Sequence, residues 1–501
     1  MRNIFIGILL FVGLLGAVGT VNAQEAPKRE FRGAWIQTMF QGDYMNLSVE
    51  ELKSNLIKKL DDLKLMGINA LVFQVRPESD AWYNSPYEPW SRFLTGKQGV
   101  APKDNFDPMA FLIAECHKRC IEFHAWLNPY RAASGGGVHL AASHIYKKHP
   151  EWFFTYNNYI YFNPGCQESI DFICTVVRDI VTRYDIDAIH MDDYFYPYPS
   201  PGLQIPDAET FKNNGRGFSS IEDWRRDNVN RLIYSLSKTI KQVKPWVRFG
   251  VSPFGIYRNN TSHPDGSATN GTENFDDLYA DILLWANEGW IDYNIPQIYW
   301  EMGHAQADYV TLAKWWAQHK GNTELYYGQD VARTMKVDQL TAKMRSVREL
   351  KGVDGYCFWP ANELFWNNKG VADTLKSSYF KYPALIPAYT RLSHHKPEQV
   401  SPISIDDNGN GKVTLTWGAV LEDDAAVGAH YFVVYAFPKK HKANINDSRY
   451  IINITPYTFA EIEKPNKEIT YVVTAVNRYH LESKGRELKI SKKILKRLRC
   501  N

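Results

Sequence analysis

The sequence has few cysteines, little excess charge of either sign and a single long apolar run. Six cysteines are scattered along 501 residues, at spacings that are typical of neither a zinc site nor a disulfide framework. The net charge of +3 gives no support for binding to nucleic acid or to a membrane surface. We therefore expect no metal, no cofactor and no nucleic-acid partner.

The single long apolar run lies at the amino terminus. Arg2 precedes an apolar stretch from Ile4 to Val18, and small residues at Val21–Ala23 fit a cleavage site. The stretch is shorter than the roughly 20 residues of a membrane span, so residues 1–23 are predicted to be a signal peptide. The absence of a Cys at the cleavage site argues against a lipid anchor. The mature protein is expected to be exported to the periplasm or secreted, as a monomer with no integral membrane segment.

From residue 31 to about residue 360, apolar strand-like runs alternate with amphipathic helix-like segments. The runs lack period-two alternation, which is typical of parallel strands covered on both faces. Strands are predicted at 31–38, 69–75, 122–128, 187–192, 247–254, 293–300, 324–330 and 355–360. This pattern predicts an α/β fold, a (β/α)8 TIM barrel over residues 30–383. The alternative, a doubly wound sheet, would need a Gly-rich phosphate loop after the first strand, and none is present.

Helices are expected between these strands. A capping box at Ser48–Glu51 predicts a helix that ends near Gly67. Further helices are predicted at 168–184, 227–243, 276–288, 310–320 and 337–350. Two long insertions, at about 77–107 and 197–225, are rich in Pro, Trp, Tyr and Asp, and we expect them to wall a cleft.

The composition changes after the barrel region. Residues 384–399 are a predicted linker, and residues 400–495 are predicted to form a small all-β sandwich. Its expected strands lie at 412–417, 431–437, 457–460 and 470–477. The segment at 406–411 is similar to the start of an EF-hand loop, but Trp417 stands where that loop needs Glu, so a turn is predicted.

The apolar run at 186–197 ends in two adjacent carboxylates, Asp192 and Asp193, followed by aromatic residues. Two acids at a buried strand end cost solvation free energy unless they are hydrogen-bonded, paired or used in chemistry. In a TIM barrel the strand ends form the active-site mouth. Acids beside flat aromatic surfaces favour carbohydrate chemistry.

Glycoside hydrolysis usually needs two carboxyl groups that flank the scissile bond, about 5–9 Å apart. We assign Asp192 as nucleophile or stabilising base and Glu301 as general acid, with Asp193 orienting a substrate hydroxyl or acetamido group. A substrate-assisted mechanism also fits adjacent Asp residues. Asp330 and Glu363 are rival acids.

Every predicted strand end carries a polar or aromatic group, which an inert barrel would not need. The predicted substrate-binding residues are Trp35, Gln74, Arg76, Trp126, Asn128, Tyr194, Gln297, Tyr299, Trp300, Asp330 and Trp359. The tryptophans could instead belong to the core, and His190 is expected to be structural. Arg76 or Arg131 could pair with a carboxylate.

Short motifs in this chain resemble the bacterial glycosyl-hydrolase-like family 10. They are FRGAW (31–35), QVRP (74–77), DAWY (80–83), AWLNP (125–129), IHMDDY (189–194), GVSPF (250–254), DDLYAD (276–281), PQIYW (296–300) and FW (358–359). The resemblance implies an exported TIM-barrel enzyme, and some relatives act on peptidoglycan glycan strands. The segment YVVTAVN (471–477) is similar to a fibronectin type III domain.

The resulting functional hypothesis is an exported glycoside hydrolase that cleaves O-glycosyl bonds of a polysaccharide, with peptidoglycan strands as a candidate. The alternative is a non-catalytic glycan-binding protein on a TIM-barrel scaffold. A metal-dependent sugar deacetylase would need clusters of His and Asp ligands at strand ends. His124 and His190 lie inside their strands and show no such partner spacing.

Overall fold

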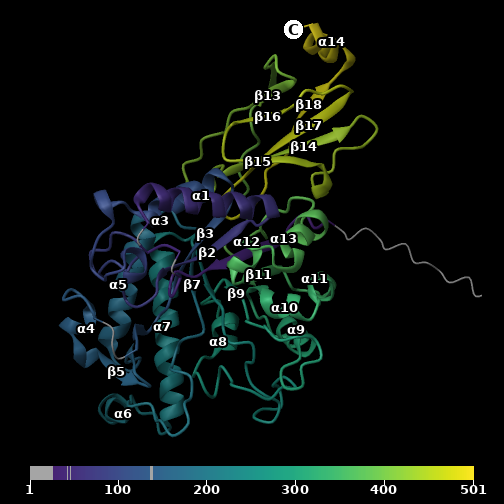
Figure 1. Ribbon diagram of the computed structural model, residues 1–501. Helices are drawn as coiled ribbons and strands as arrows, with labels where there is room; N and C mark the ends of the chain where they lie inside the picture. Colours follow the sequence, from purple (N-terminus) through teal and green to yellow (C-terminus); the bar gives the residue numbers. More distant parts are fainter. Residues whose placement is uncertain (1–25, 42, 46, 136–138, 501) are drawn as a thin grey trace, which may run out of the picture.

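The computed structural model describes residues 26–41, 43–45, 47–135 and 139–500, so the predicted signal peptide lies outside the described residues. Two bodies are visible in Figure 1: a barrel with its surrounding helices, and a β-rich C-terminal unit stacked on one end of it. Across the described segments, no helix combines the length and the apolarity that a bilayer crossing requires.

A closed parallel barrel forms the first body, in the strand order β1-β11-β10-β9-β8-β7-β3-β2. The strands are β1 (Phe31–Ile36), β2 (Ala70–Arg76), β3 (Glu122–Leu127), β7 (Ala188–Met191), β8 (Arg248–Val251), β9 (Tyr293–Asn294), β10 (Glu324–Asp330) and β11 (Gly355–Trp359). Nearly every strand residue is buried, as expected for a sheet that is covered on both faces. The predicted TIM barrel is confirmed.

One barrel strand is shorter than the sequence predicts. The apolar run at 293–300 predicts a long strand, but β9 ends at Asn294. Pro296 follows and has no N–H to donate to a ladder. Isolated bridges from Gln297 to Phe254 and Gly328 keep this segment aligned with its neighbours. The residues after Pro296 therefore still reach the mouth of the barrel.

Helices surround the barrel. They include α1 (Val49–Met66), α3 (Pro108–Lys118), α5 (Gln167–Arg183), α7 (Ile221–Val243), α8 (Ile282–Asn287), α9 (Tyr309–Gln318), α10 (Val331–Lys336), α11 (Leu340–Glu349), α12 (Ala361–Phe365) and α13 (Val371–Thr374). Ser48 and Glu51 make the predicted capping box of α1. The helix predicted at 276–288 begins only at Ile282, because Asp281 caps it by accepting the N–H of Leu284.

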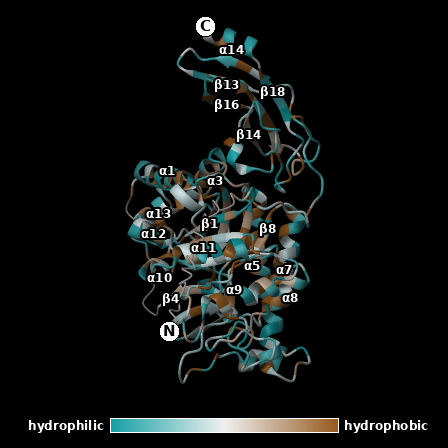
Figure 2. Cartoon of the chain, turned by 90° about the vertical axis from the view of Figure 1, so that its right-hand side faces the viewer, coloured by the Kyte–Doolittle hydropathy of each residue, from teal (hydrophilic) through white to brown (hydrophobic). Residues whose placement is uncertain are grey.

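Hydrophobic residues gather in the interior of the barrel domain, around β8, β9 and α5 (Figure 2). Inside the barrel itself, aromatic rings fill the space, and the rings of Phe31 and Tyr326 stack with centroids 3.9 Å apart. The barrel is therefore a packed core and not a pore.

The insertions contribute short elements at the opposite end from the C-terminal unit (Figure 1). The insertion after β2 carries α2 (Arg92–Thr95). The segment after β3 forms a small antiparallel sheet of β4 (Arg131–Ser134), β6 (Tyr159–Phe162) and β5 (Phe153–Tyr156), and α6 (Ala208–Asn214) follows β7. The small sheet has no counterpart in the sequence prediction, because strands of four residues are too short to show a period.

The C-terminal unit consists of two antiparallel sheets, with strand orders β12-β13-β16 and β15-β14-β17-β18. The strands are β12 (Ser404–Asp407), β13 (Lys412–Thr416), β14 (Tyr431–Pro438), β15 (Ile451–Thr455), β16 (Phe459–Glu463), β17 (Ile469–Val476) and β18 (Arg486–Ile490), followed by α14 (Lys492–Cys500). The sequence prediction lacked β12, β15 and β18, which are half-exposed edge strands or close neighbours of turns. A turn joins β12 to β13 where the EF-hand-like segment lies.

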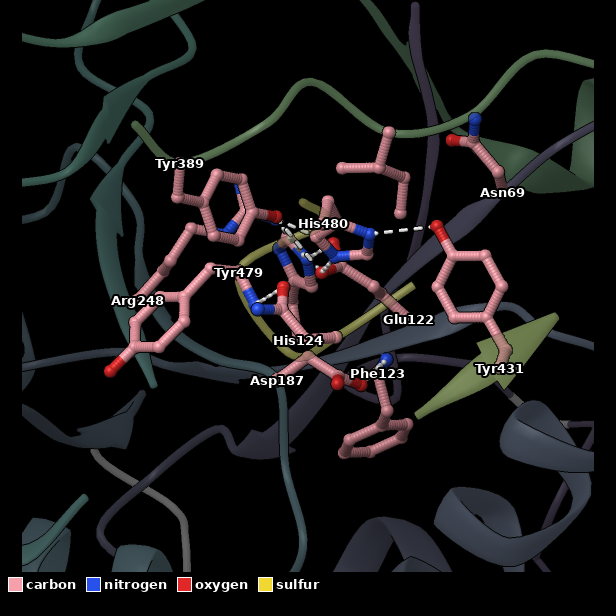
Figure 3. A network of polar contacts seen from close by, with 12 residues as sticks. Asn69, Glu122, Phe123, His124, Asp187, Arg248, Tyr389, Tyr431, Tyr479 and His480 are labelled. Carbon is pink, nitrogen blue, oxygen red and sulfur yellow. Dashed lines mark hydrogen bonds and ion pairs between the residues drawn. The ribbon is translucent and has the colours of Figure 1, made fainter. Parts of the chain in front are cut away.

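A buried carboxylate joins the two bodies (Figure 3). Glu122, at the start of β3, accepts hydrogen bonds from Arg248 of β8, from Tyr389 Oη at 2.9 Å and from His480 Nε2 at 2.7 Å. Burial opposes ionisation of Glu122, but the charges of Arg248 and His480 outweigh it and hold the pKa of the carboxyl well below its usual range. The carboxylate is therefore an ionised link between the barrel, the segment of Tyr389 and the loop after β17.

Replacing Glu122 with Gln should lower the free energy of unfolding by roughly 3–5 kcal/mol, because Arg248 would lose its closest buried counter-charge. Chemical denaturation measures the change. Asp62→Asn is the matched control, since Asp62 forms an exposed ion pair with Lys58 at 2.7 Å and its loss should cost less than about 0.5 kcal/mol. Equal stability of the two variants would contradict this account of the interface.

Candidate functional site

Asp192 is the first residue after β7, and neutral N–H groups surround its carboxylate. Trp126 Nε1 donates to Oδ2 at 3.1 Å, and Asn128 Nδ2 lies 3.2 Å from both oxygens. The backbone N–H of Tyr194 donates to Oδ1 at 3.3 Å. Trp126 lies near the end of β3 and Asn128 directly follows this strand, which is paired with β7. The barrel register therefore places these donors on Asp192.

Burial raises the pKa of Asp192 to about 6, because neutral donors replace only part of the lost hydration. The positive charge of Arg131 opposes the rise, and the negative charge of Asp193 adds to it. Arg131 is held nearby by two contacts: its N–H donates to Asn128 Oδ1 at 2.8 Å, and its guanidinium lies 4.9 Å from the ring centre of Tyr194. Near neutral pH this carboxyl can therefore change its protonation state.

Asp193 has different partners from its neighbour. The phenol of Tyr198 donates to its carboxylate, and the side chain of Gln297 is a second hydrogen-bond partner. Burial raises the pKa of Asp193 despite these bonds. Tyr299 lies in the same electrostatic field: burial, and then the charge of Asp193, raise the pKa of its phenol well above the usual value. The phenol of Tyr299 therefore stays protonated near neutral pH and can donate a hydrogen bond.

Glu301 and Asp330 belong to a second charged group, centred on Lys343 of α11. Burial lowers the pKa of Lys343 to about 8, against the opposing charges of Asp330 and Glu301. Lys343 Nζ donates to the carbonyl of Trp300 at 2.8 Å. Asp330 also caps α10 by accepting the N–H of Arg333 at 2.8 Å. Arg131 and Asp193 are the charged groups that shift the pKa of Asp192. The assignment of Asp192 and Glu301 as a catalytic pair stays a prediction.

Aromatic rings form a continuous row beside the acids. The ring centroids are 5.4 Å apart for Trp300 and Phe254, 6.0 Å for Phe254 and Tyr198, and 5.6 Å for Tyr198 and Tyr194. Trp300, Tyr198 and Tyr194 are all half-buried, so part of each ring remains accessible. The row supplies flat apolar surface next to Asp193.

A second aromatic contact lies beside Asp192. Trp126, which donates to that carboxylate, meets Trp359 edge to face with centroids 6.0 Å apart. Trp359 is half-buried at the end of β11. Trp35, by contrast, is buried in the barrel and donates to His190 Nε2 at 3.2 Å. His190 is fully buried within β7, as predicted for a structural residue.

Two polar residues of the predicted set have their polar atoms engaged inside the protein. Gln74 Oε1 accepts the backbone N–H groups of Thr38 and Met39, both at 3.0 Å. Arg76 binds Glu88 through Nε at 2.9 Å and Nη2 at 2.7 Å. These bonds fix the loops that follow β1 and β2.

Arg76 also reaches the acid site indirectly. Its Nη1 donates to the carbonyl of Asn128 at 2.6 Å, and the Asn128 side chain binds Asp192. The guanidinium is fully buried, so it does not itself face the cleft. Arg76 therefore binds the Glu88 carboxylate and also positions Asn128, which donates a hydrogen bond to Asp192.

The sequence prediction missed several residues of this end of the barrel. Tyr198 and Phe254 complete the aromatic row. Lys343 donates to the carbonyl of Trp300, and the charge of the neighbouring Glu301 acts on its ammonium group. Tyr198 could have been found from the aromatic run that follows the acid pair. Lys343 lies on a helix far along the chain, and no pattern signals it. Glu78 is also fully buried, where it binds Arg92 of α2 and the backbone N–H of Ser134 at 2.7 Å.

Sequence comparisons match this chain to a protein family and to two proteins named as glycosyl hydrolases. Residues 30–343 match the family described as Glycosyl hydrolase-like 10. Glycosyl hydrolase YngK of Bacillus subtilis (strain 168) is 39% identical over 482 residues, which cover 93% of each chain. Glycosyl hydrolase DigH of Escherichia coli (strain K12) is 39% identical over 319 residues, or 59% of this chain and 72% of DigH.

Among solved structures, the glycoside hydrolase domain of PgaB (BpsB) from Bordetella bronchiseptica has a TM-score of 0.42 and 12% identity, over 70% of this chain and 99% of that domain. The sequence identity to YngK and DigH, 39% in each case, is much higher than the 12% identity to this structure. Because the family match spans more than half of the chain and the alignment with YngK spans nearly all of both proteins, this chain belongs to the Glycosyl hydrolase-like 10 family.

Proposed function

We propose that this protein is an exported glycoside hydrolase that cleaves glycosidic bonds within a polysaccharide. The observation that carries the proposal is the Asp192 carboxyl, which is buried at a strand end, held by neutral donors and has a pKa of about 6. A group with such a pKa is suited to chemistry near neutral pH. Family membership independently points to carbohydrate substrates.

Asp192 is assigned as the nucleophile or stabilising base. Its neutral donors hold the carboxylate in one orientation, and no cation hydrogen-bonds to it among the described residues, which leaves the negative charge available to an oxocarbenium-like transition state. Glu301 is assigned as the general acid that protonates the leaving oxygen. Water then completes hydrolysis at the sugar carbon, and its proton returns to a carboxylate.

Asp193 and Tyr299 support a second mechanism. Both lie at the same mouth, and both hold their protons more tightly than usual because they are buried. They could orient and polarise a 2-acetamido group that attacks the sugar carbon in place of an enzyme carboxylate. Peptidoglycan glycan strands carry such groups, and they are the candidate substrate, because some members of the family that this chain resembles act on them.

The remaining assignments complete the proposal. Residues 1–23 act as a signal peptide and direct the protein to the periplasm or outside the cell. Residues 30–383 form the catalytic domain, 384–399 the linker and 400–495 a fibronectin type III domain. Sheets of three and four antiparallel strands support the last assignment. Trp359, Trp126 and the row from Trp300 to Tyr194 line the sugar-binding surface.

Activity should depend on pH through Asp192. The ionised form is the active one, so kcat/KM should fall as pH decreases through the pKa of about 6, and should be about tenfold lower one unit below it. The measurement is the release of reducing ends from peptide-free glycan strands at different pH values. A rate that is flat across the range from about pH 5 to pH 8 would contradict the role of Asp192.

The Asp192→Asn substitution should lower kcat by at least about 100-fold without lowering stability on electrostatic grounds. The pKa of Asp192 is raised in the folded protein, so its contribution to stability is present at low pH and is lost as pH rises through about 6. Above that pH, removing the charge should not destabilise the fold. Thermal unfolding at high and low pH provides the control for a folding defect.

Glu301→Gln should also lower kcat strongly, whereas Glu363→Gln should retain most of the activity. Glu363 is the matched control because it is a nearby half-buried acid whose carboxylate accepts a hydrogen bond from Asn368 at 2.6 Å. Mass spectrometry of the products compares the parent with both variants. The opposite ranking would transfer the acid role to Glu363. Glycan binding without turnover in the parent, unchanged in Asp192→Asn, would support the non-catalytic alternative.

A further inference from the structure

Three potential metal ligands meet where the C-terminal unit contacts the barrel. His117 lies near the end of α3, Asp187 directly precedes β7, and His430 directly precedes β14. One ligand atom from each residue lies within 4.8 Å of the others. Within the described residues, three or more His, Cys, Asp or Glu side chains bring their ligand atoms this close together at this one place. It lies at the opposite end of β7 from Asp192, so it takes no part in the proposed catalysis.

Neighbouring groups hold the three side chains in place. Asp187 Oδ2 accepts the backbone N–H of Phe123 at 2.7 Å, a contact visible in Figure 3. His117 Nε2 is 2.9 Å from the same oxygen. The rings of His117 and His430 meet edge to face, with centroids 5.4 Å apart. His117 therefore contacts both of the other residues: its ring nitrogen bonds to Asp187, and its ring packs against that of His430.

A cavity adjoins the group. It has a volume of about 460 Å³, and His117, Asp187 and His430 all contribute to its wall, together with residues of both bodies such as Cys120 and His480. Each of the three ligand residues is only half-buried. An ion can therefore reach the group, and there is room for a water molecule as an additional ligand.

The ligand chemistry favours zinc. Two imidazoles and one carboxylate are a set that Zn²⁺ binds in tetrahedral geometry, with a water in the fourth position. Zn–N and Zn–O distances of about 2.0–2.1 Å require ligand atoms roughly 3.3 Å apart. The observed separations, from 2.9 Å between His117 and Asp187 to at most 4.8 Å, bracket that value and need only side-chain adjustments. Ca²⁺ and Mg²⁺ prefer oxygen ligands and do not fit this set.

We propose that His117, Asp187 and His430 bind one Zn²⁺ ion that ties the C-terminal unit to the barrel. The barrel supplies His117 and Asp187, and the C-terminal unit supplies His430. All three ligands are together only when the two bodies are docked, so the ion stabilises the docked arrangement by mass action. The proposal is independent of the glycosidase assignment and departs from the expectation that no metal binds.

The test uses the full mature chain without an affinity tag, purified without chelator. Elemental analysis should find about one zinc per chain. Chelator-treated protein titrated with ZnSO₄ should bind one equivalent, and its Tm should rise with free zinc concentration. Absence of stoichiometric binding, or a Tm unaffected by zinc, would overturn the proposal, whatever the catalytic activity.

Substitutions locate the ion. His430→Ala and His117→Ala should each weaken zinc binding by more than the roughly 10–100-fold that follows loss of an outer-shell partner. The control is His149→Ala, because His149 is a surface residue whose ring contacts Glu151 and Trp152. The zinc affinity of this variant should equal that of the parent protein. Equal affinity of His430→Ala and the parent would place any bound zinc elsewhere. Far-UV circular dichroism checks that each variant is folded. If a variant is not folded, the zinc stoichiometry of the parent protein decides the proposal.

Discussion

Closure of the parallel strands into one barrel is the constraint on which the other features depend. All carboxyl ends of the strands open at one mouth and all amino ends at the other. One strand therefore delivers residues to both ends: β7 begins next to Asp187 and ends next to Asp192. The two ends carry different chemistry because different groups cover them.

Buried acids at the two ends have opposite pKa shifts, and their partners explain the difference. Glu122, at the amino end, meets the guanidinium of Arg248 and the imidazole of His480, and its pKa is held low despite burial. Asp192, at the carboxyl end, meets an indole, an amide and a backbone N–H, and its pKa is raised to about 6. Cationic partners make the first acid a structural link, whereas neutral partners leave the second available for reaction.

The C-terminal unit contributes residues to the barrel end that is remote from Asp192 and Asp193. It supplies His480 to the Glu122 network and His430 to the proposed zinc site, and Arg478 pairs with Asp185 at 2.9 Å. At the other end, Arg131 of β4 packs on the ring of Tyr194, and the aromatic row lies beside the acid pair Asp192 and Asp193. Docking and chemistry are thus separated along the barrel axis.

The sequence by itself determined the barrel, because eight apolar runs with helical segments between them leave few other ways to bury both faces of a sheet. It also determined that Asp192 and Asp193 follow a strand, and that Ser48 begins a helix. The lengths of β9 and α8 depended on Pro296 and Asp281, local signals that compete with apolar periodicity. Only the tertiary structure decided the partners of each acid. Lys343 beside Glu301 and His430 beside His117 come from distant parts of the chain, and periodicity carries no information about contacts between side chains so far apart.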